Sequence, residues 1–354
     1  MPLRPPLGSH AEFLGKTATA RIIGGRVRRA AAPPSNGGWS VIPGLGAYYR
    51  PGRLPEALAL LAQEPGCEVL AGGTDLLLES TPRQALLDIS RLGLDQLELQ
   101  AADLVIGACV TVQRLRESAL AAEWADGILV GACLEFGTLQ VRNMATVGGN
   151  VAHALPAADL VPALLALDAV VELAHADGAG GVACRRVPLD GFATGPFRTV
   201  LLPGELVTAL RVPARTRAWR AQYRKLGRVH KDLAQVNCAA ALALDAGRVQ
   251  EARVALGAVH PTVVRVRAAE ALLCGTSPAA AGWDAVVEQA QECARGFVQP
   301  ITDLRATREW RRHTCGVLLG RCLRWLADPH NGGRVPRLED GPSYCAGLAA
   351  EVGS

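Results

Sequence analysis

The sequence predicts an α+β protein whose 354 residues form more than one domain. Up to about residue 214, short apolar runs of strand length alternate with helical patterns. A polar segment over 215–220 then interrupts the pattern, and the region beyond it contains a second, smaller set of strands and helices. The composition, with 49% apolar and 20% charged residues, is typical of a globular protein. These observations place a domain boundary near residue 215.

The region before the boundary contains several strands and three helical stretches. Its strands are short and apolar, and its helices show apolar residues at three- and four-residue steps. In chain order, we expect a helix over 55–61, strands over 67–71 and 85–90, a hairpin of 97–99 with 104–107, a helical pattern up to about 134, a helix over 160–167, and strands over 169–173 and 206–212. A Pro/Gly/Arg-rich stretch over 178–198 lies between the last two strands.

The region beyond the boundary begins with two apolar runs separated by the turn Asp245-Ala246-Gly247. Three helical patterns follow. The expected elements are strands over 237–244 and 251–257 and helices at about 264–274, 282–296 and 306–327.

Positive charge is concentrated at the N-terminus. Residues 1–38 hold six basic residues against the single acidic Glu12, although the whole chain has a net charge of only +4. The rest of the chain is therefore close to neutral, and we expect no nucleic-acid-binding surface on it. Frequent proline and glycine predict a flexible extension over 1–37, and a similar composition predicts a loose tail over 327–354.

Ten cysteines are scattered along the chain without any Cys-x-x-Cys pair. Iron–sulfur and zinc sites of four cysteines usually contain such a close pair, so we expect no metal site in this chain. We also expect no membrane span and no secretory signal, because no run of ~18 apolar residues and no cleavable leader pattern occur. The expected compartment is the reducing cytoplasm.

Two Gly-Gly pairs are the strongest chemical signal. Gly72-Gly73-Thr74 follows a strand, and Gly148-Gly149-Asn150 follows Thr146. A glycine pair at a strand end allows main-chain N–H groups to converge on a small volume without an obstructing Cβ, which suits a pyrophosphate. The alternative is that each pair only forms a tight turn. Neither a Walker A loop nor a complete Rossmann fingerprint is present, so a bound dinucleotide needs another architecture.

Longer motifs surround both pairs and continue downstream. They are Leu70-Ala71-Gly72-Gly73-Thr74-Asp75-Leu76, Ala145-Thr146-Val147-Gly148-Gly149-Asn150-Val151-Ala152-His153, Pro156-Ala157-Ala158-Asp159, Pro203-Gly204-Glu205-Leu206, Tyr223-Arg224-Lys225-Leu226-Gly227 and Pro300-Ile301-Thr302-Asp303-Leu304-Arg305. Over about residues 40–326 the chain closely resembles the FAD-binding (medium) subunits of bacterial molybdenum hydroxylases, the xanthine dehydrogenase and carbon monoxide dehydrogenase flavoprotein family. The resemblance implies a PCMH-type FAD-binding domain of two α/β subdomains over 38–214 and a smaller α+β domain over 219–326.

The resemblance also implies how FAD is held. The two glycine loops would surround the pyrophosphate and ribityl chain, while Leu206 and Val207 would lie beside the isoalloxazine ring. Asp159 would bind the adenosine part, near which Phe136 and Gly137 also lie. Lys225 would contact the cofactor, and Phe197 matches a ring-facing tyrosine of some relatives. The expected cofactor-binding residues are Val69, Leu70, Ala71, Gly72, Gly73, Thr74, Asp75, Phe136, Gly137, Thr146, Gly149, Asn150, Ala152, His153, Asp159, Phe197, Leu206, Val207 and Lys225.

Some of these side chains have simpler explanations. Asp159 could cap the helix that follows it, and Lys225 could pair with Asp232 at the surface. Phe197 could be an ordinary core residue. His153 could attach a flavin covalently, but its neighbours fit a pattern of backbone contacts, which favours non-covalent binding.

The implied function is that of an oxidoreductase subunit, with no residue in this chain expected to transform the organic substrate. Its FAD would take electrons from [2Fe–2S] clusters of a small partner subunit and pass them to an external acceptor. A large molybdopterin-binding subunit would carry the molybdenum cofactor. Two alternatives stay open: a self-sufficient FAD-dependent oxidase, and an assembly subunit without flavin. The oxidases often carry a flavin-linked histidine where this chain has Thr74-Asp75.

Overall fold

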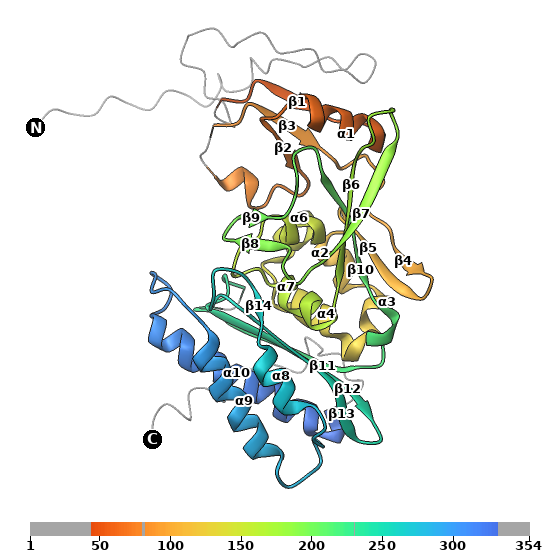
Figure 1. Ribbon diagram of the computed structural model, residues 1–354. Helices are drawn as coiled ribbons and strands as arrows, with labels where there is room; N and C mark the ends of the chain where they lie inside the picture. The colour runs from red at the N-terminus through yellow and green to blue at the C-terminus, as the bar shows by residue number, and fades with distance from the viewer. Residues whose placement is uncertain (1–43, 80–81, 230, 332–354) are drawn as a thin grey trace, which may run out of the picture.

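The protein is described by a computed structural model that covers residues 44–79, 82–229 and 231–331 (Figure 1). The expected extension over 1–37 and most of the expected tail lie outside the described residues. The chain runs from a small N-terminal sheet through a central region to a C-terminal unit with long helices (Figure 1). This mixture of helices and strands confirms the predicted α+β class.

The N-terminal sheet is parallel, with strand order β1–β3–β2 and one helix, α1, packed on it. Pro55 lies in the first turn of α1, where the missing N–H breaks no hydrogen bond, and Leu58 is buried in the core below. The loop that leaves β2 carries the first glycine pair. The elements are β1 (Ala47–Tyr49), α1 (Leu54–Gln63), β2 (Cys67–Leu70), the 3-10 turn η2 (Leu76–Leu78) and β3 (Ala85–Asp88).

The central sheet is antiparallel, with strand order β4–β5–β10–β6–β7. A bulge between Val207 and Ala209 interrupts the pairing of β10 with β6 near the start of β10. A short hairpin, β8 with β9, precedes β10. The strands are β4 (Leu97–Gln100), β5 (Asp103–Gly107), β6 (Val170–Ala176), β7 (Val182–Pro188), β8 (Ala193–Gly195), β9 (Arg198–Thr199) and β10 (Leu206–Val212).

Short helices fill the space between the central sheet and the C-terminal domain. Trp124 on this helical side, Leu164 of α7 and Leu210 of β10 belong to one buried apolar cluster, so these helices and the sheet share a core. The helices are α2 (Val112–Arg116), α3 (Ala119–Ala122), α4 (Ile128–Glu135), α5 (Leu139–Met144), α6 (Val147–Ala152) and α7 (Leu160–Ala166).

The C-terminal domain is an antiparallel sheet, β11–β12–β13–β14, covered by helices on both faces. Successive side chains of β12 point to opposite faces of the sheet. One set packs into the core under the C-terminal helices, and the other packs into the core that the short helices share with the central sheet. Cys238 and Leu242 pack with α8, α9 and α10, whereas Ala239 and Ala241 pack toward α4 and α7. The elements are β11 (Arg220–Leu226), β12 (Val236–Asp245), β13 (Arg248–Gly257), β14 (Val264–Arg265), α8 (Arg267–Leu273), α9 (Trp283–Phe297) and α10 (Arg308–Ala327).

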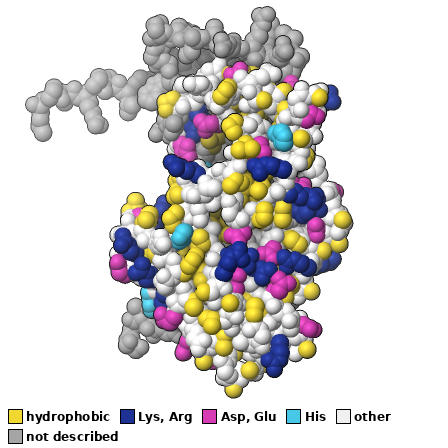
Figure 2. All heavy atoms as spheres, in the orientation of Figure 1, with side chains coloured by type: hydrophobic (Ala, Val, Ile, Leu, Met, Phe, Trp, Pro, Cys, Tyr) yellow, Lys and Arg dark blue, Asp and Glu magenta, His cyan; other side chains and the backbone are white. Residues whose placement is uncertain are grey.

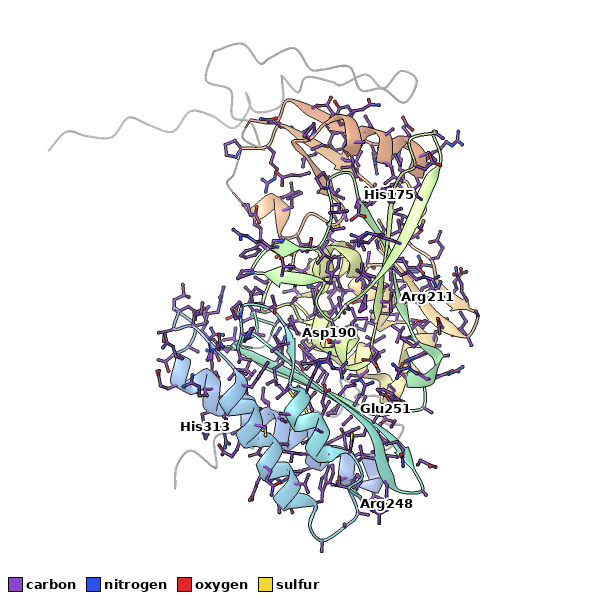
Figure 3. All side chains as sticks on the ribbon, viewed as in Figure 1. His175, Asp190, Arg211, Arg248, Glu251 and His313 are labelled. Atoms are coloured by element: carbon purple, nitrogen blue, oxygen red, sulfur yellow. The ribbon has the colours of Figure 1, made fainter. Side chains whose placement is uncertain are left out.

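Ion pairs reinforce the junction between the two domains. Asp168, which follows α7, pairs with three arginines: Arg215, Arg253 and Arg265. Burial alone would raise the pKa of Asp168, but hydrogen bonds from Arg253 and Arg215 and the nearby positive charges hold it below its ordinary value. Arg253 also pairs with Glu251 of the C-terminal sheet, which Figure 3 labels. Figure 2 shows basic and acidic side chains gathered at the level of this junction.

Two of the longer strands lie where the sequence predicts none, in addition to the short strands β1, β8, β9 and β14. β7 falls within the Pro/Gly/Arg-rich stretch 178–198, and β11 begins where the polar boundary segment ends. β7 is an edge strand whose residues are partly or largely exposed, so it needs no apolar run. β11 carries arginines and a lysine among its buried residues, which conceals its alternation in the sequence.

Candidate functional site

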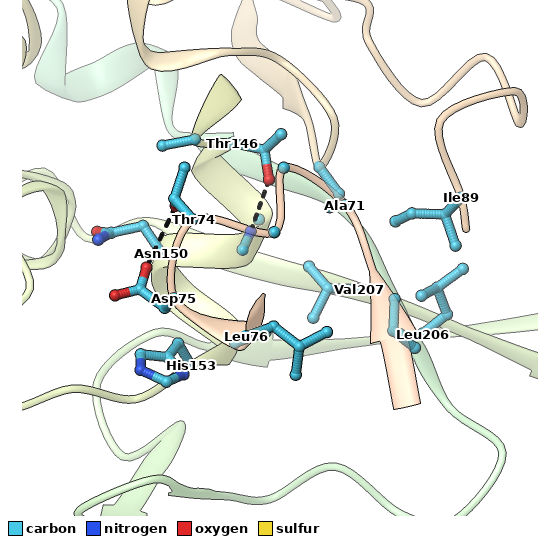
Figure 4. Close-up of a pocket in the computed structure, with 18 of the residues that line it drawn as sticks. Ala71, Thr74, Asp75, Leu76, Ile89, Thr146, Asn150, His153, Leu206 and Val207 are labelled. Carbon is cyan, nitrogen blue, oxygen red and sulfur yellow. Dashed lines mark hydrogen bonds between the residues drawn. The ribbon is translucent and has the colours of Figure 1, made fainter. Parts of the chain in front are cut away.

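A cavity of about 310 Å³ lies among three chain segments that are far apart in the sequence. Figure 4 shows side chains from all three around it. The segments are the first glycine loop (residues 68–76), the second glycine segment (residues 145–153) and a strap (residues 201–207) that leads into β10. Ile89, Ala108 and Phe136 complete the lining.

The first glycine loop turns sharply against the chain just before the second segment. A Cβ on Gly72 would lie 1.9 Å from the carbonyl oxygen of Met144 and 2.6 Å from its carbonyl carbon. Backbone atoms cannot move aside as the end of a flexible side chain can, so only glycine fits this position. The close approach brings the two glycine regions together at one side of the cavity.

The backbone amides of the first loop are left available. The N–H groups of residues 72–75 donate to no acceptor among the described residues, although these residues line the cavity. Residues 72–74 are half-buried and Asp75 is exposed, so this run of free donors is available to water or to an anionic ligand. The Thr74 hydroxyl, which is 3.4 Å from a carboxylate oxygen of Asp75, adds a further polar group.

The second glycine segment is built differently from the turn expected from the sequence. It forms the short helix α6, and the Thr146 Oγ1 at its N-cap accepts from the Gly149 N–H at 3.1 Å. The Gly148 N–H donates to Ala108 O at 3.0 Å, and the Asn150 N–H donates to Thr146 O at 3.0 Å. Helix formation and capping therefore occupy the amides that the sequence suggested were free.

Polar side chains of the second segment still reach the cavity. The Asn150 Oδ1 accepts from the Leu160 N–H at the start of α7 at 3.3 Å, so Asn150 connects the cavity wall to that helix. The His153 ring packs edge-on against Phe197, with 5.1 Å between ring centroids. Phe197 is 60% exposed, so the alternative that it is a core residue is wrong.

Apolar side chains form the opposite wall. Leu206 and Val207 lie at the start of β10, and Ile89 follows β3; Figure 4 shows all three across the cavity from Thr74 and Asn150. Leu206 and Val207 are almost fully buried. The cavity therefore has one wall that offers hydrogen-bond donors and one that suits a flat apolar group.

Asp159 and Lys225 meet each other beside the cavity without lining it. Lys225 Nζ lies 2.8 Å from Asp159 Oδ2 and also donates to Glu135 O at 3.0 Å. Burial raises the pKa of Asp159, while Lys225 and hydrogen bonds from Asn237 and Tyr223 act in the opposite direction. The two alternatives from the sequence are wrong, because the Asp159 carboxylate makes no capping bond and Asp232 pairs with Arg228.

Most of the expected site residues come together around the cavity. Those that line it are Val69, Ala71, Gly72, Gly73, Thr74, Asp75, Phe136, Thr146, Gly149, Asn150, Ala152, His153, Leu206 and Val207. Those outside the lining are Leu70, Gly137, Asp159, Phe197 and Lys225. Leu70 packs under the first loop, and Arg142 fixes the carbonyls of Phe136 and Gly137.

Several lining residues were not expected from the sequence. They include Leu76, Ile89, Ala108, Leu201 and Glu205. Glu205 had a visible signal, because it belongs to the motif Pro203-Gly204-Glu205-Leu206, whereas Ile89 and Ala108 are ordinary residues that directly follow strands.

Within the ranges that the structure describes, no group of three or more His, Cys, Asp or Glu side chains is arranged to hold a metal ion. No described helix has both the length and the apolar character needed to cross a membrane.

Comparison with known families gives two matches. The family described as FAD binding domain in molybdopterin dehydrogenase matches residues 43–215, and the family described as CO dehydrogenase flavoprotein C-terminal domain matches residues 221–326.

Individual relatives agree with these matches. The xanthine dehydrogenase FAD-binding subunit of Escherichia coli O157:H7 is 30% identical over 279 residues, which cover 75% of this chain and 91% of the relative. The carbon monoxide dehydrogenase medium chain of Hydrogenophaga pseudoflava is 31% identical over 289 residues, covering 80% and 97%. The solved carbon monoxide dehydrogenase of that organism aligns with a TM-score of 0.75 at 31% identity, covering 81% of this chain and 99% of that chain. Quinoline 2-oxidoreductase from Pseudomonas putida aligns with a TM-score of 0.72 at 27% identity, covering 81% and 98%.

Proposed function

This chain belongs to the family of FAD-binding subunits of molybdopterin dehydrogenases, and we propose that it carries electrons within a multi-subunit molybdenum hydroxylase. It is thus an oxidoreductase subunit. The proposed route begins at [2Fe–2S] clusters of a partner chain and ends at an external acceptor such as a quinone, oxygen, NAD or a carrier protein. Bound FAD supplies the chemistry of this route, because it can receive electrons singly and deliver them as a pair.

The observation that carries the proposal is the row of free amides in the first glycine loop. The N–H groups of residues 72–75 have no described acceptor, and Gly72 allows the chain to pass close to the second segment without a side chain in the way. A pyrophosphate is an acceptor of suitable charge for such a row. Because the opposite wall is formed by Leu206, Val207 and Ile89, the cavity also offers an apolar surface for the isoalloxazine ring of FAD. The residues present therefore fit FAD.

Residues outside the lining support this site indirectly. Lys225 joins Asp159 to Glu135 O, and Glu135 immediately precedes the cavity residue Phe136. Asn150 holds the start of α7 while it lines the cavity. These contacts position the wall where the adenosine part of FAD would lie.

The proposed partners are a large molybdopterin-binding subunit and a small [2Fe–2S] subunit. The relatives are named medium chains or FAD-binding subunits, which supports a shared complex. The described cysteines are all free thiols, which supports assembly of the complex in the reducing cytoplasm.

A first experiment tests the cofactor. The protein expressed alone should be yellow and contain close to one FAD per chain, and acid precipitation should release the colour as FAD. Colour that stays in the pellet would contradict non-covalent binding, and FMN in the supernatant would contradict the choice of cofactor. A colourless protein that binds no added FAD would favour the flavin-free assembly subunit.

A second experiment tests the complex. Affinity purification from the native host should recover two further chains, with molybdenum and iron in the purified assembly. Substrate turnover by the isolated, metal-free chain would instead favour the self-sufficient oxidase.

A further inference from the structure

Glu205, which lines the cavity next to Leu206 and Val207, pairs with an arginine outside the lining. Arg185 Nε lies 2.6 Å from Glu205 Oε1, and Arg185 Nη2 lies 2.7 Å from Glu205 Oε2. Two parallel bonds of this kind fix both the distance and the orientation of the groups. Arg185 belongs to β7, so its side chain reaches across β6 to the strap that leads into β10.

The same pair fixes the backbone of the strap. Glu205 Oε2 accepts from the Leu202 N–H at 2.8 Å, and Arg185 Nη2 donates to Val200 O at 3.1 Å. The Glu205 N–H donates to Leu202 O at 3.0 Å, which closes a turn over Pro203 and Gly204. These hydrogen bonds restrict the backbone conformation of the strap. They therefore fix the positions of Leu206 and Val207 in the cavity wall.

The two charges differ in their exposure. The Glu205 side chain is 3% exposed, whereas the Arg185 side chain is 35% exposed. Among the ionisable side chains that line the described cavity, which are Glu68, Asp75, His153 and Glu205, only Glu205 is buried. Glu205 is thus the buried member of the pair, and Arg185 is the more exposed one.

Neighbouring charges reinforce this arrangement. Hydrogen bonding to Arg185 lowers the pKa of Glu205. Burial acts against this, but the backbone bond from Leu202 and the positive charge of Arg185 also lower the pKa. Glu205 is accordingly ionised at neutral pH, and its negative charge is offset by Arg185.

We propose that Arg185 and Glu205 are positioning residues that hold the strap against the flavin ring and, as a neutral pair, set the reduction potential of the bound flavin. This inference rests on the proposed function, because it requires FAD in the cavity. Charge close to a flavin changes the relative stability of its oxidised and reduced forms, and the effect is strong where water is excluded. When one member of the pair is removed, the direction in which the reduction potential changes should therefore depend on whether Arg185 or Glu205 remains.

The test compares Glu205→Gln with Arg185→Gln in the full chain with bound FAD at pH 8. Glu205→Gln can still accept from the Leu202 N–H but leaves the guanidinium unpaired, which should raise the two-electron reduction potential. Arg185→Gln leaves a buried, uncompensated carboxylate, which should lower it. The double variant should return toward the wild-type potential, because neither charge remains.

Spectroelectrochemical titration measures the reduction potential of the wild type, the two single variants and the double variant. The rate of FAD release, which is expected to increase in each variant, reports the positioning role.

Matched controls come from the next residue along β7. Arg186 pairs with Glu172 at 2.9 Å, but its side chain is 62% exposed and Glu172, unlike Glu205, does not line the cavity. Arg186→Gln should therefore leave both the potential and the release rate unchanged. If Arg185→Gln does not fold, Arg185→Lys keeps the charge and loses the two-bond geometry; it should keep the wild-type potential and release FAD faster.

The outcomes separate the two proposals. A wild-type chain that binds no FAD overturns the proposed function. A chain that binds FAD, but whose Gln variants shift the potential in the same direction or not at all, overturns the role of the pair and leaves the proposed function standing.

Discussion

The two glycine regions share the same dipeptide and lie side by side, yet they use it for different purposes. In the first loop, the amides of residues 72–75 have no described acceptor. In the second segment, capping and helix bonds occupy the amides, and Gly148 is pressed against Ala108, where an added Cβ would lie 2.6 Å from the Ala108 Cβ. The comparison shows that one pair leaves donors available and the other allows a helix to pack closely.

This difference explains why motif similarity is a poor guide to the role of each glycine. At Gly72 the missing side chain permits contact between two backbone segments at the cavity. At Gly148 it permits contact between α6 and the residue that follows β5. We therefore expect substitutions in the first loop to weaken FAD binding more than those in the second.

The largest effect is expected from Gly72→Ala. The new Cβ would meet the Met144 carbonyl, so the loop must move and its amides lose their alignment. FAD should be lost on purification, and overpacking should lower the free energy of unfolding by about 1–3 kcal/mol. Absorbance spectra and urea unfolding of the flavin-free protein measure the two effects.

The matched control for this variant is Gly131→Ala. Gly131 lies inside α4 with open space around its Cβ position, so alanine should stabilise the helix by about 0.5–1 kcal/mol and leave FAD binding intact. Full FAD retention by Gly72→Ala would show that the first loop does not hold the cofactor.

The next largest effect is expected in amide hydrogen exchange, when the FAD-bound and flavin-free proteins are compared. With FAD at 100 times its Kd, amide hydrogen exchange of residues 72–75 should slow by up to about 100-fold relative to the flavin-free protein, because the bound pyrophosphate occupies their N–H groups. The amides of residues 147–150 already have acceptors and should change much less. Equal protection of both regions would remove the distinction between them.

Gly148→Ala should lower stability by an amount similar to Gly72→Ala but weaken FAD binding less. Its Cβ would lie 2.6 Å from the Ala108 Cβ and 2.8 Å from the Ala108 oxygen, so α6 must shift away from its neighbour. We expect a loss of about 1–3 kcal/mol in unfolding free energy, with FAD binding weakened less than in Gly72→Ala. Loss of FAD at unchanged stability would mean that the second segment contacts the cofactor through its backbone.

The smallest effect is expected from Thr146→Ala, which removes the N-cap of α6. The Gly149 N–H loses its acceptor, and stability should fall by about 1 kcal/mol. Thr146→Ser retains the oxygen and should behave nearly as the wild type in thermal unfolding. If serine is as destabilising as alanine, the capping bond is not the reason for threonine at this position.

The sequence predicted most helices and strands because their apolar periodicity is local. The strand β12 and the helices α9 and α10 follow the expected ranges closely. β7 and β11 were missed, because the side chains of β7 lie at an exposed edge and those of β11 include Arg220 and Lys225, whose partners come from other elements. A pattern of apolar residues cannot reveal a strand whose polar side chains pair with residues far away in the sequence.

The site was predicted to a similar extent. The glycine motifs and Leu206-Val207 pointed to residues that do line one cavity. The ion pair of Asp159 with Lys225, 66 residues apart, was not foreseen, because nothing in either neighbourhood indicates the other. The same holds for Arg185 and Glu205, which meet only because β7 and β10 flank β6.

The sequence by itself determined the α+β class, the family, and the positions of the two glycine pairs. The fold class depends on local apolar periodicity, and the family and the glycine pairs are recognised from motifs of consecutive residues. Only the tertiary structure decided that the amides of the first loop are free while those of the second are used, since hydrogen-bond acceptors such as Ala108 O come from elsewhere in the chain. It also decided which charges are buried as pairs, because a carboxylate such as Glu205 is stable out of water only where the fold brings a cation to it.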